Sequence, residues 1–340
     1  MIGTASDLAR YEEVAPGCSV DLSDNTNLWG SPSSVGRVIT STRVDEMSRY
    51  PSAYSADLKT SIAKYAGVDA SMVATGCGSD DVLDSALRAF GRHGDAVALL
   101  DPTFSMMRSF ASASGLRIAP IRFDEADLSS AFRATGASIT YLCSPNNPTG
   151  GSLGPQVIES IVADAPGIVI IDEAYIDFGG IASTDLLERY ENVLITRTMS
   201  KAFGLAGFRV GYGLGSQDVI DRVEAARGPY KVSALSERVA IEVLASDTGW
   251  VRQRAAEVIE NRGRLALELS ILGCPPLESS ANFVLVPVRD AGRIESGMRA
   301  RSIAVRTFTG LTGIGDAVRI TVGPWGVMQK CLSALSEVLQ

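Results

Sequence analysis

The segment Arg197-Thr-Met-Ser-Lys-Ala-Phe-Gly-Leu-Ala-Gly-Phe-Arg209 follows directly after an apolar run at residues 193–196. The run predicts a short buried strand, so the segment places a lysine, small hydroxyl side chains and an arginine just beyond a strand end. A lysine amine can form a Schiff base with an aldehyde, and hydroxyl and guanidinium groups can hold a phosphate. A single lysine is usually a solvated surface charge, but the polar turn around Lys201 favours a functional role. The segment therefore predicts a phosphorylated aldehyde cofactor.

The same alternation of apolar runs and helical patterns extends on both sides of this segment, from about residue 55 to residue 235. Helical spacing recurs at 58–66 and 82–90. Further buried strands are expected at residues 96–100, 139–142 and 168–171. Such alternation indicates an α/β domain with a mostly parallel sheet, and in such sheets the chemistry lies beyond the carboxyl ends of the strands.

The pattern changes after Gly228-Pro229. Residues 236–272 read as one or two long helices, and a final amphipathic helix is expected at about 329–339. Strand-like segments are expected at residues 282–288, 304–308 and 318–322. We predict a large domain at 45–235 and a smaller α+β domain made of residues 1–44 and 236–340.

The composition describes an ordinary globular protein and excludes several classes. The 340 residues, 46% of them apolar, provide for about two domains, and no apolar run approaches the roughly 20 residues of a membrane span. The net charge of −8 argues against a nucleic-acid or anionic-membrane footprint. Five scattered cysteines without CxxC spacing, and an N-terminus without a signal-peptide pattern, predict free thiols and a cytoplasmic location.

The chain has a single histidine, His93, in a segment that reads as a surface turn. One histidine excludes multi-histidine metal sites and disfavours a Ser-His-Asp triad, so no metal is expected. We expect lysine, tyrosine or carboxylate side chains to transfer protons instead.

A glycine turn, Gly76-Cys-Gly-Ser-Asp-Asp81, leads into the expected helix at 82–90. Free amides at a helix start can bind a phosphate, although a turn capped by an aspartate is the more common explanation for such a segment. Asp81 stands where a dinucleotide fingerprint needs its third glycine, so that fingerprint is missing. A second turn, Ser144-Pro-Asn-Asn-Pro-Thr-Gly150, is held rigid by its prolines and follows a buried strand.

Asp172 ends a wholly apolar strand in the run Ile168-Val-Ile-Ile-Asp-Glu-Ala-Tyr175. A buried carboxylate is costly unless a cation pairs with it, and a protonated pyridine nitrogen is such a cation. Tyr175 could then hydrogen-bond the ring oxygen, and Phe104, beyond another strand, could stack on the ring. The alternatives are a helix-capping aspartate and a core phenylalanine. Together with Lys201, these residues favour pyridoxal 5'-phosphate.

Two arginines near the C-terminus could bind an anion. In the alternating segment Val318-Arg-Ile-Thr-Val322, the side chain of Arg319 lies on the face opposite the aliphatic ones. A solvent-facing arginine is the alternative to a fork that binds a carboxylate or phosphate. Arg306, thirteen residues earlier, could supply a second positive charge.

The order of these segments resembles that of the aspartate-aminotransferase-like (fold type I) pyridoxal-phosphate enzymes, and most of all that of the histidinol-phosphate aminotransferases. The similarity runs from about Leu22 to Gly323, and its most specific stretches are 144–150, 172–178 and 197–209. The resemblance implies a mostly parallel seven-stranded sheet in the large domain, a pyridoxal 5'-phosphate cofactor and a homodimer.

The resemblance also implies roles for individual residues. Lys201 forms the Schiff base and then acts as the general base, and Asp172 pairs with the ring nitrogen. Tyr175 and Asn147 contact the ring oxygen, and Phe104 stacks on the ring. The residues expected around the cofactor's phosphate are Gly78, Ser79, Asp80, Thr198, Ser200 and Arg209. Tyr50 matches a tyrosine that enters the neighbouring subunit's phosphate site, and Arg319 and Arg306 match arginines that bind the substrate's carboxylate or phosphate.

Three positions depart from the family pattern. The segment Asn25-Thr-Asn-Leu-Trp-Gly30 lacks the family's acidic residue at its second position, Cys77 replaces a common asparagine, and Phe104 replaces a common tyrosine. These changes leave Lys201 and Asp172 in place and bear on the choice of substrate.

We therefore expect transamination between an amino donor, histidinol phosphate or an amino acid, and an oxo acid such as 2-oxoglutarate. An aromatic or broad-range amino-acid aminotransferase and a threonine-phosphate decarboxylase remain alternatives. A cofactor-binding protein without turnover and a nucleotide-dependent dehydrogenase fit less well, because the full set of cofactor residues is present and the dinucleotide fingerprint is not.

Overall fold

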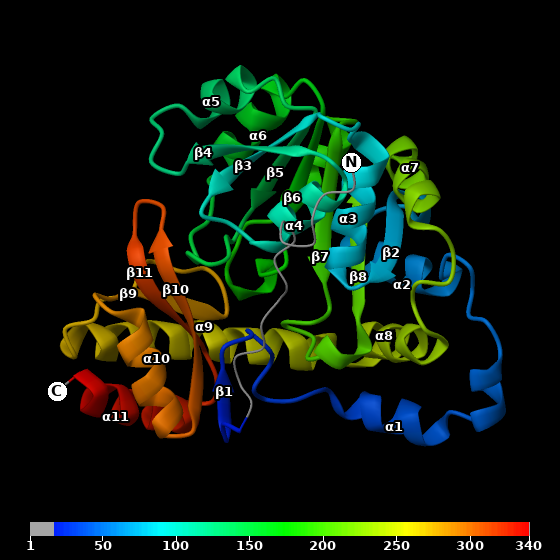
Figure 1. The fold of residues 1–340 in the computed structure, drawn as a ribbon. Helices are drawn as coiled ribbons and strands as arrows, with labels where there is room; N and C mark the ends of the chain where they lie inside the picture. The colour runs from blue at the N-terminus through cyan, green and yellow to red at the C-terminus, as the bar shows by residue number, and fades with distance from the viewer. Residues whose placement is uncertain (1–16, 340) are drawn as a thin grey trace.

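The computed structural model describes residues 17–339, which are built around two β-sheets (Figure 1). The larger sheet has seven strands in the order β2-β8-β7-β6-β5-β3-β4. Its strands are β2 (Val73–Cys77), β3 (Ala96–Asp101), β4 (Arg117–Arg122), β5 (Ile139–Cys143), β6 (Ile168–Asp172), β7 (Val193–Thr198) and β8 (Val210–Gly215). Only β8 runs antiparallel to its neighbours β2 and β7. The predicted α/β class and the mostly parallel seven-stranded sheet are confirmed.

The central strands are apolar throughout because helices cover both faces of the large sheet. Every residue of β5 and of β6 is buried, as expected for strands of a parallel sheet inside an α/β layer. One face packs against α3 (Ser79–Phe90), α4 (Met106–Ala113) and α7 (Gln217–Arg227). The other face packs against α2 (Ala56–Ala66), α5 (Leu128–Ala134), α6 (Pro155–Asp164) and α8 (Ala234–Ser246).

The smaller sheet joins the two ends of the chain. Its four strands, in spatial order, are β1 (Val20–Leu22), β10 (Ile303–Leu311), β11 (Gly315–Thr321) and β9 (Phe283–Pro287). The long helix α9 (Thr248–Ile271) runs below the large sheet in Figure 1, and α10 (Ala291–Ala300) and α11 (Trp325–Leu339) lie beside the small one. None of the helices within residues 17–339 is long and apolar enough to cross a membrane.

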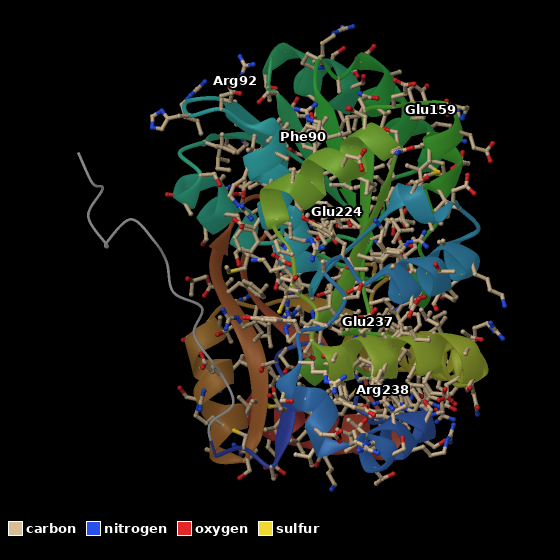
Figure 2. All side chains as sticks on the ribbon, turned by 90° about the vertical axis from the view of Figure 1, so that its right-hand side faces the viewer. Phe90, Arg92, Glu159, Glu224, Glu237 and Arg238 are labelled. Carbon is tan, nitrogen blue, oxygen red and sulfur yellow. The ribbon has the colours of Figure 1, made fainter. Side chains whose placement is uncertain are left out.

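The segment before the large sheet lies along the outside of α8. It contains α1 (Ser33–Ser41) and the short 3-10 helix η2 (Val44–Ser48). Figure 2 faces this side of the molecule, where Arg238 of α8 pairs with Glu46 and Glu224 of α7 pairs with Lys59. The other short 3-10 helices are η3 (Ala70–Met72), η4 (Ile176–Phe178), η5 (Thr184–Glu188) and η6 (Ala206–Phe208).

Most expected elements are present, with differences at the last helix and at three strands of the large sheet. The strand-like and helical segments after residue 228 are confirmed, but the last helix begins at Trp325 rather than Gln329. No apolar run in the sequence predicts β2, β4 or β8. β4 is a mostly exposed edge strand with a proline, and β8 carries three glycines, so neither has the apolar pattern of a buried strand. The division into two domains at residues 44 and 235 stays a prediction.

Candidate active site

A cavity of about 590 Å³ lies at the carboxyl ends of the parallel strands. One wall comes from the ends of β3, β5, β6 and β7, and the other from the N-terminal segment and the β10–β11 hairpin. The predicted site residues that line this cavity are Ser79, Asp80, Phe104, Asn147, Asp172, Tyr175, Thr198, Ser200, Lys201, Arg209, Arg306 and Arg319. Gly78 lies beside them, whereas Tyr50 does not line the cavity.

Lys201 stands in the turn after β7, and its amine faces the cavity. The hydroxyl of Thr198 accepts the backbone N–H of Ser200 at 3.1 Å, which shapes this turn. The Lys201 Nζ donates to the backbone carbonyl of Asp24 at 2.9 Å. Burial in the cavity wall lowers the pKa of Lys201 to about 8. More of this amine is therefore unprotonated near neutral pH than in an ordinary lysine, as a nucleophile and proton acceptor requires.

Asp172 is a nearly fully buried carboxylate at the end of β6, with 3% of its surface exposed. Its Oδ1 accepts the backbone N–H of Ala174 at 3.1 Å, and its Oδ2 accepts the hydroxyl of Tyr141 at 2.7 Å. Burial raises the pKa of Asp172 to about 6. Among residues 17–339 no basic side chain forms a salt bridge with it, so a cationic group of a ligand in the cavity would be a fitting partner.

A second corner of the cavity suits a phosphate. Arg209, in a left-handed backbone conformation with φ of 53°, donates to the Ser200 hydroxyl at 3.3 Å and lies 3.5 Å from the Asp80 carboxylate. A Cβ added at Gly78 would meet the Arg209 guanidinium at 2.5 Å, so the glycine allows this close approach. Helix α3 begins at Ser79, which lines the cavity, and the backbone N–H groups at a helix start can bind an anion.

The turn before α3 is not a turn capped by an aspartate, the common explanation for a glycine-rich segment of this kind. The cap residue is Gly78, without a side-chain cap bond. Asp81 instead accepts the backbone N–H of Cys77 at 3.0 Å and so stabilises the turn itself. The backbone amides at the helix start are thereby left for another acceptor.

The side of the cavity opposite the phosphate corner carries amide and phenol groups. Tyr175 accepts a hydrogen bond from the side-chain amide of Asn25 at 3.0 Å. Asn147 accepts one from Arg319 at 2.6 Å through its Oδ1, which leaves its amide N–H groups to donate elsewhere. Burial raises the pKa of Tyr175, so its phenol stays protonated unless a ligand changes its surroundings.

Asn25 is a site residue that the sequence analysis did not assign. Its backbone has a left-handed φ of 60°, its N–H donates to the Thr321 hydroxyl, and its carbonyl accepts from Asn282. These bonds fix the asparagine between β11 and Tyr175. The only local signal in the sequence is that asparagine tolerates left-handed backbone better than most residues.

A hydrogen bond beside the cavity joins the two sheets. Asp101, at the end of β3, accepts the hydroxyl of Thr312 at 2.6 Å and the guanidinium of Arg108 at 2.7 Å. Thr312 belongs to the tip of the β10–β11 hairpin, so the contact joins parts of the chain that are 211 residues apart. Phe104 lines the same cavity. It is partly buried and packs against the core cluster that the large sheet forms with α3, α4 and α7.

Arg306 and Arg319 lie directly opposite each other on the antiparallel strands β10 and β11. Both line the cavity, so two positively charged side chains lie on one face of the small sheet. Like charges at such a position repel each other, and an anion between them relieves the repulsion.

Tyr50 is the predicted residue that the described chain does not bring to the site. Its side chain is 84% exposed, and its ring lies 4.9 Å from that of Tyr230. The expectation that Tyr50 reaches a neighbouring subunit's site stays a prediction.

Comparison with known proteins adds to this geometry. The model of the family described as "Aminotransferase class I and II" matches residues 19–335. The histidinol-phosphate aminotransferase of Thermoanaerobacter pseudethanolicus is 35% identical over 297 residues, which cover 85% of this chain and 84% of that protein.

Two solved structures share the fold. The histidinol-phosphate aminotransferase of Sinorhizobium meliloti, in complex with pyridoxal-5'-phosphate, has a TM-score of 0.85 and 25% identity and covers 95% of this chain and 91% of its own. The L-threonine-O-3-phosphate decarboxylase of Porphyromonas gingivalis has a TM-score of 0.84, 21% identity and coverage of 94% and 98%. The second likeness shows the fold alone, so the fold does not separate transamination from decarboxylation.

Proposed function

The chain belongs to the class I and II aminotransferase family and is a pyridoxal-phosphate-dependent aminotransferase, and from this premise we propose that its amino donor is histidinol phosphate. We propose 2-oxoglutarate as the amino acceptor. The single observation that carries the choice of donor is the pair Arg306 and Arg319, which face each other in the cavity. Two guanidiniums on one face suit a phosphate, which offers several oxygens to planar donors.

Bound pyridoxal 5'-phosphate supplies an aldehyde that accepts an amino group and a protonated ring that withdraws electrons. The residues around the cavity fit this group. Arg209, Ser200 and the start of α3 would hold the phosphate, while Asp172 would keep the ring nitrogen protonated. Asn147 and Tyr175 would donate to the ring oxygen, and Phe104 would cover the ring face.

Lys201 has two tasks in this proposal. Its amine would hold the cofactor by its aldehyde until a donor amine takes its place. Once released, the amine would take a proton from the donor's α-carbon and deliver it to the cofactor's exocyclic carbon, two atoms away. A pKa near 8 suits both tasks, because an amine poised near the working pH can accept and release a proton with little cost.

A panel of amino donors tests the choice of substrate. The purified enzyme, supplied with 2-oxoglutarate, would receive histidinol phosphate, histidinol, phenylalanine, tyrosine and threonine phosphate, and glutamate and carbon dioxide would be measured. We expect kcat/KM for histidinol phosphate to exceed that for histidinol by at least about 100-fold, because the phosphate adds charge-assisted hydrogen bonds. Faster turnover of aromatic amino acids would contradict the proposal, and carbon dioxide released from threonine phosphate would favour the decarboxylase.

We further propose that the enzyme is a homodimer in which Tyr50 completes the partner's phosphate corner. The segment that carries Tyr50 is unusually apolar for a surface: Val44 is 88% exposed, and Ile39 and Met47 are close to half exposed. Exposed apolar clusters of this kind mark protein interfaces. Mixing Lys201→Ala chains with Tyr50→Ala chains tests the idea, since one intact site per mixed dimer should restore part of the activity. A monomer in light scattering would contradict it.

The five cysteines are unpaired. This state supports our proposal that the enzyme works in the reducing environment of the cytoplasm.

A further inference from the structure

A buried tyrosine outside the cavity wall holds the carboxylate that the cofactor's ring nitrogen would meet. Tyr141 has no exposed surface, and its hydroxyl donates to Asp172 Oδ2 at 2.7 Å. Because Tyr141 does not line the cavity, it cannot touch the substrate or the reacting atoms. Any effect on the reaction must act through Asp172.

The register of the central strands brings the two side chains together. Strand β5 runs parallel to β6, with Cys143 opposite Asp172. Tyr141 lies two residues before Cys143 and so on the same face of the sheet, from which its long side chain reaches diagonally to the strand end. The ring packs in the apolar layer formed with α3, α4 and α7, which fixes its position.

The hydroxyl of Tyr141 offsets the cost of burying Asp172. Burial favours the neutral form of a carboxylic acid, whereas a donor bonded to the carboxylate favours the charged form. The backbone N–H of Ala174 holds the other oxygen at 3.1 Å, so both oxygens are oriented. Burial raises the pKa of Tyr141, which keeps the phenol protonated and therefore able to donate to Asp172.

The other titratable groups near Asp172 do not provide this bond. Asp80 from α3 is a second carboxylate, and its negative charge disfavours ionisation of Asp172. Cys143 from β5 and Tyr175 after β6 are buried and stay neutral, with raised pKa values. Among these groups Tyr141 is therefore the one that bonds the carboxylate and supports its ionised state, together with the Ala174 N–H and the Thr196 hydroxyl.

We propose that Tyr141 is a positioning residue that keeps Asp172 ionised and aimed at the ring nitrogen of the cofactor. The proposal rests on the assignment of Asp172 to that nitrogen, made above. Pyridoxal phosphate that has carbon in place of the ring nitrogen, the 1-deaza analogue, separates the two ideas, because it lacks the group that Asp172 would meet.

The test compares two dissociation constants, measured by fluorescence as the cofactor-free protein is titrated with each compound. The ratio is the constant for the 1-deaza analogue divided by the constant for pyridoxal phosphate. In Tyr141→Phe this ratio should fall by about tenfold, since the bond to a charged acceptor is lost. The matched control is Tyr212→Phe, which removes the hydroxyl of another buried tyrosine that bonds Arg197 rather than Asp172. The ratio of the control should equal that of the natural enzyme.

Two outcomes would overturn the proposal. Equal losses of affinity for both compounds in Tyr141→Phe would leave the ratio unchanged and show a purely structural role, and unchanged affinities for both compounds would show no role. A natural enzyme that does not distinguish the two compounds would instead overturn the assignment of Asp172 itself. If Tyr141→Phe fails to fold, 3-fluorotyrosine at position 141 provides the second test. Its more acidic hydroxyl donates more strongly, so the ratio of dissociation constants should rise. A ratio that does not rise contradicts the proposal.

The pH profile gives a further readout that a structural role would not move. Without the Tyr141 hydroxyl the pKa of Asp172 rises, so the carboxylate is ionised only above a higher pH. The acid limb of kcat should therefore shift to higher pH in Tyr141→Phe but not in Tyr212→Phe. An acid limb at the natural position in both variants would contradict the proposal.

Discussion

The two walls of the cavity are built in different ways. The wall from the seven-stranded sheet carries Asp172 and Lys201 at the ends of buried neighbouring strands. The wall from the N-terminal segment and the small sheet carries Asn25, Arg306 and Arg319, which come together from opposite ends of the chain. The first wall holds the groups suited to the cofactor, and the second holds those suited to an anionic substrate. Arg319 and Asn25 bond Asn147 and Tyr175 of the first wall, so we expect Lys201 and Arg306 to be the positions where cofactor chemistry and substrate choice can be altered separately.

The largest effect is expected from the first wall. Lys201→Ala removes the amine that would bind the cofactor and move the proton, so transamination should fall by more than about 1,000-fold. Circular dichroism and the unfolding midpoint should match those of the natural enzyme. Replacement of Lys231, a partly exposed lysine after α7, should leave activity unchanged. Substantial activity in Lys201→Ala would contradict the assignment.

The stability of the first wall depends on a buried ion pair beside Asp172. Glu173 has no exposed side-chain surface, and its Oε2 lies 2.7 Å from the Arg197 guanidinium. Glu173→Gln leaves a buried arginine without its counter-charge, so the free energy of unfolding should fall by about 3–5 kcal/mol. Urea titration measures this change.

The exposed pair of Arg43 and Asp45 is the control for this variant. Asp45→Asn should leave the urea midpoint unchanged, because exposed ion pairs contribute little. A loss of stability in Asp45→Asn equal to that in Glu173→Gln would show that burial of the pair does not matter.

A change in the second wall should act on the substrate alone. Arg306→Met removes one guanidinium of the facing pair, and kcat/KM for histidinol phosphate should fall by about 100-fold while histidinol is little affected. The visible absorbance of the bound cofactor should stay the same. Arg301→Met, which removes an exposed arginine paired with Glu337, is the control. Equal losses for both donors would mean that Arg306 does not bind the phosphate.

The smallest effect concerns the protonation of Lys201. Since its pKa is lowered to about 8, the rate at which cofactor-free protein takes up pyridoxal phosphate should rise about tenfold from pH 7 to pH 9 and then level off. The rate rises because only the unprotonated amine attacks an aldehyde, and the unprotonated fraction of Lys201 increases as the pH passes through its pKa. Stopped-flow absorbance measures the rate. A rate that keeps rising beyond pH 10 would mean that the amine has an ordinary pKa.

The sequence predicts the first wall well because its information is local. The apolar run that ends in Asp172 and the one that precedes the Lys201 turn predict parallel strands, and the carboxyl ends of parallel strands meet at one edge. Gly67 likewise ends α2 in a left-handed conformation with φ of 74°, directly after the helical spacing at 58–66.

The second wall is harder to predict because its contacts join distant parts of the chain. Asn25 bonds Tyr175 across 150 residues, and the Asp24 carbonyl accepts from Lys201 across 177. No periodicity or turn rule links such positions. The bond between Tyr141 and Asp172 also depends on the register of β5 against β6, which a single sequence does not reveal.

Trapping of the cofactor tests the central claim most directly. The enzyme refilled with pyridoxal phosphate would be reduced with borohydride, digested, and its labelled peptide sequenced by mass spectrometry. We predict a stable label on Lys201, the one of the chain's five lysines that lines the cavity. A label on any of the other four lysines, or no label after reduction, would contradict the account.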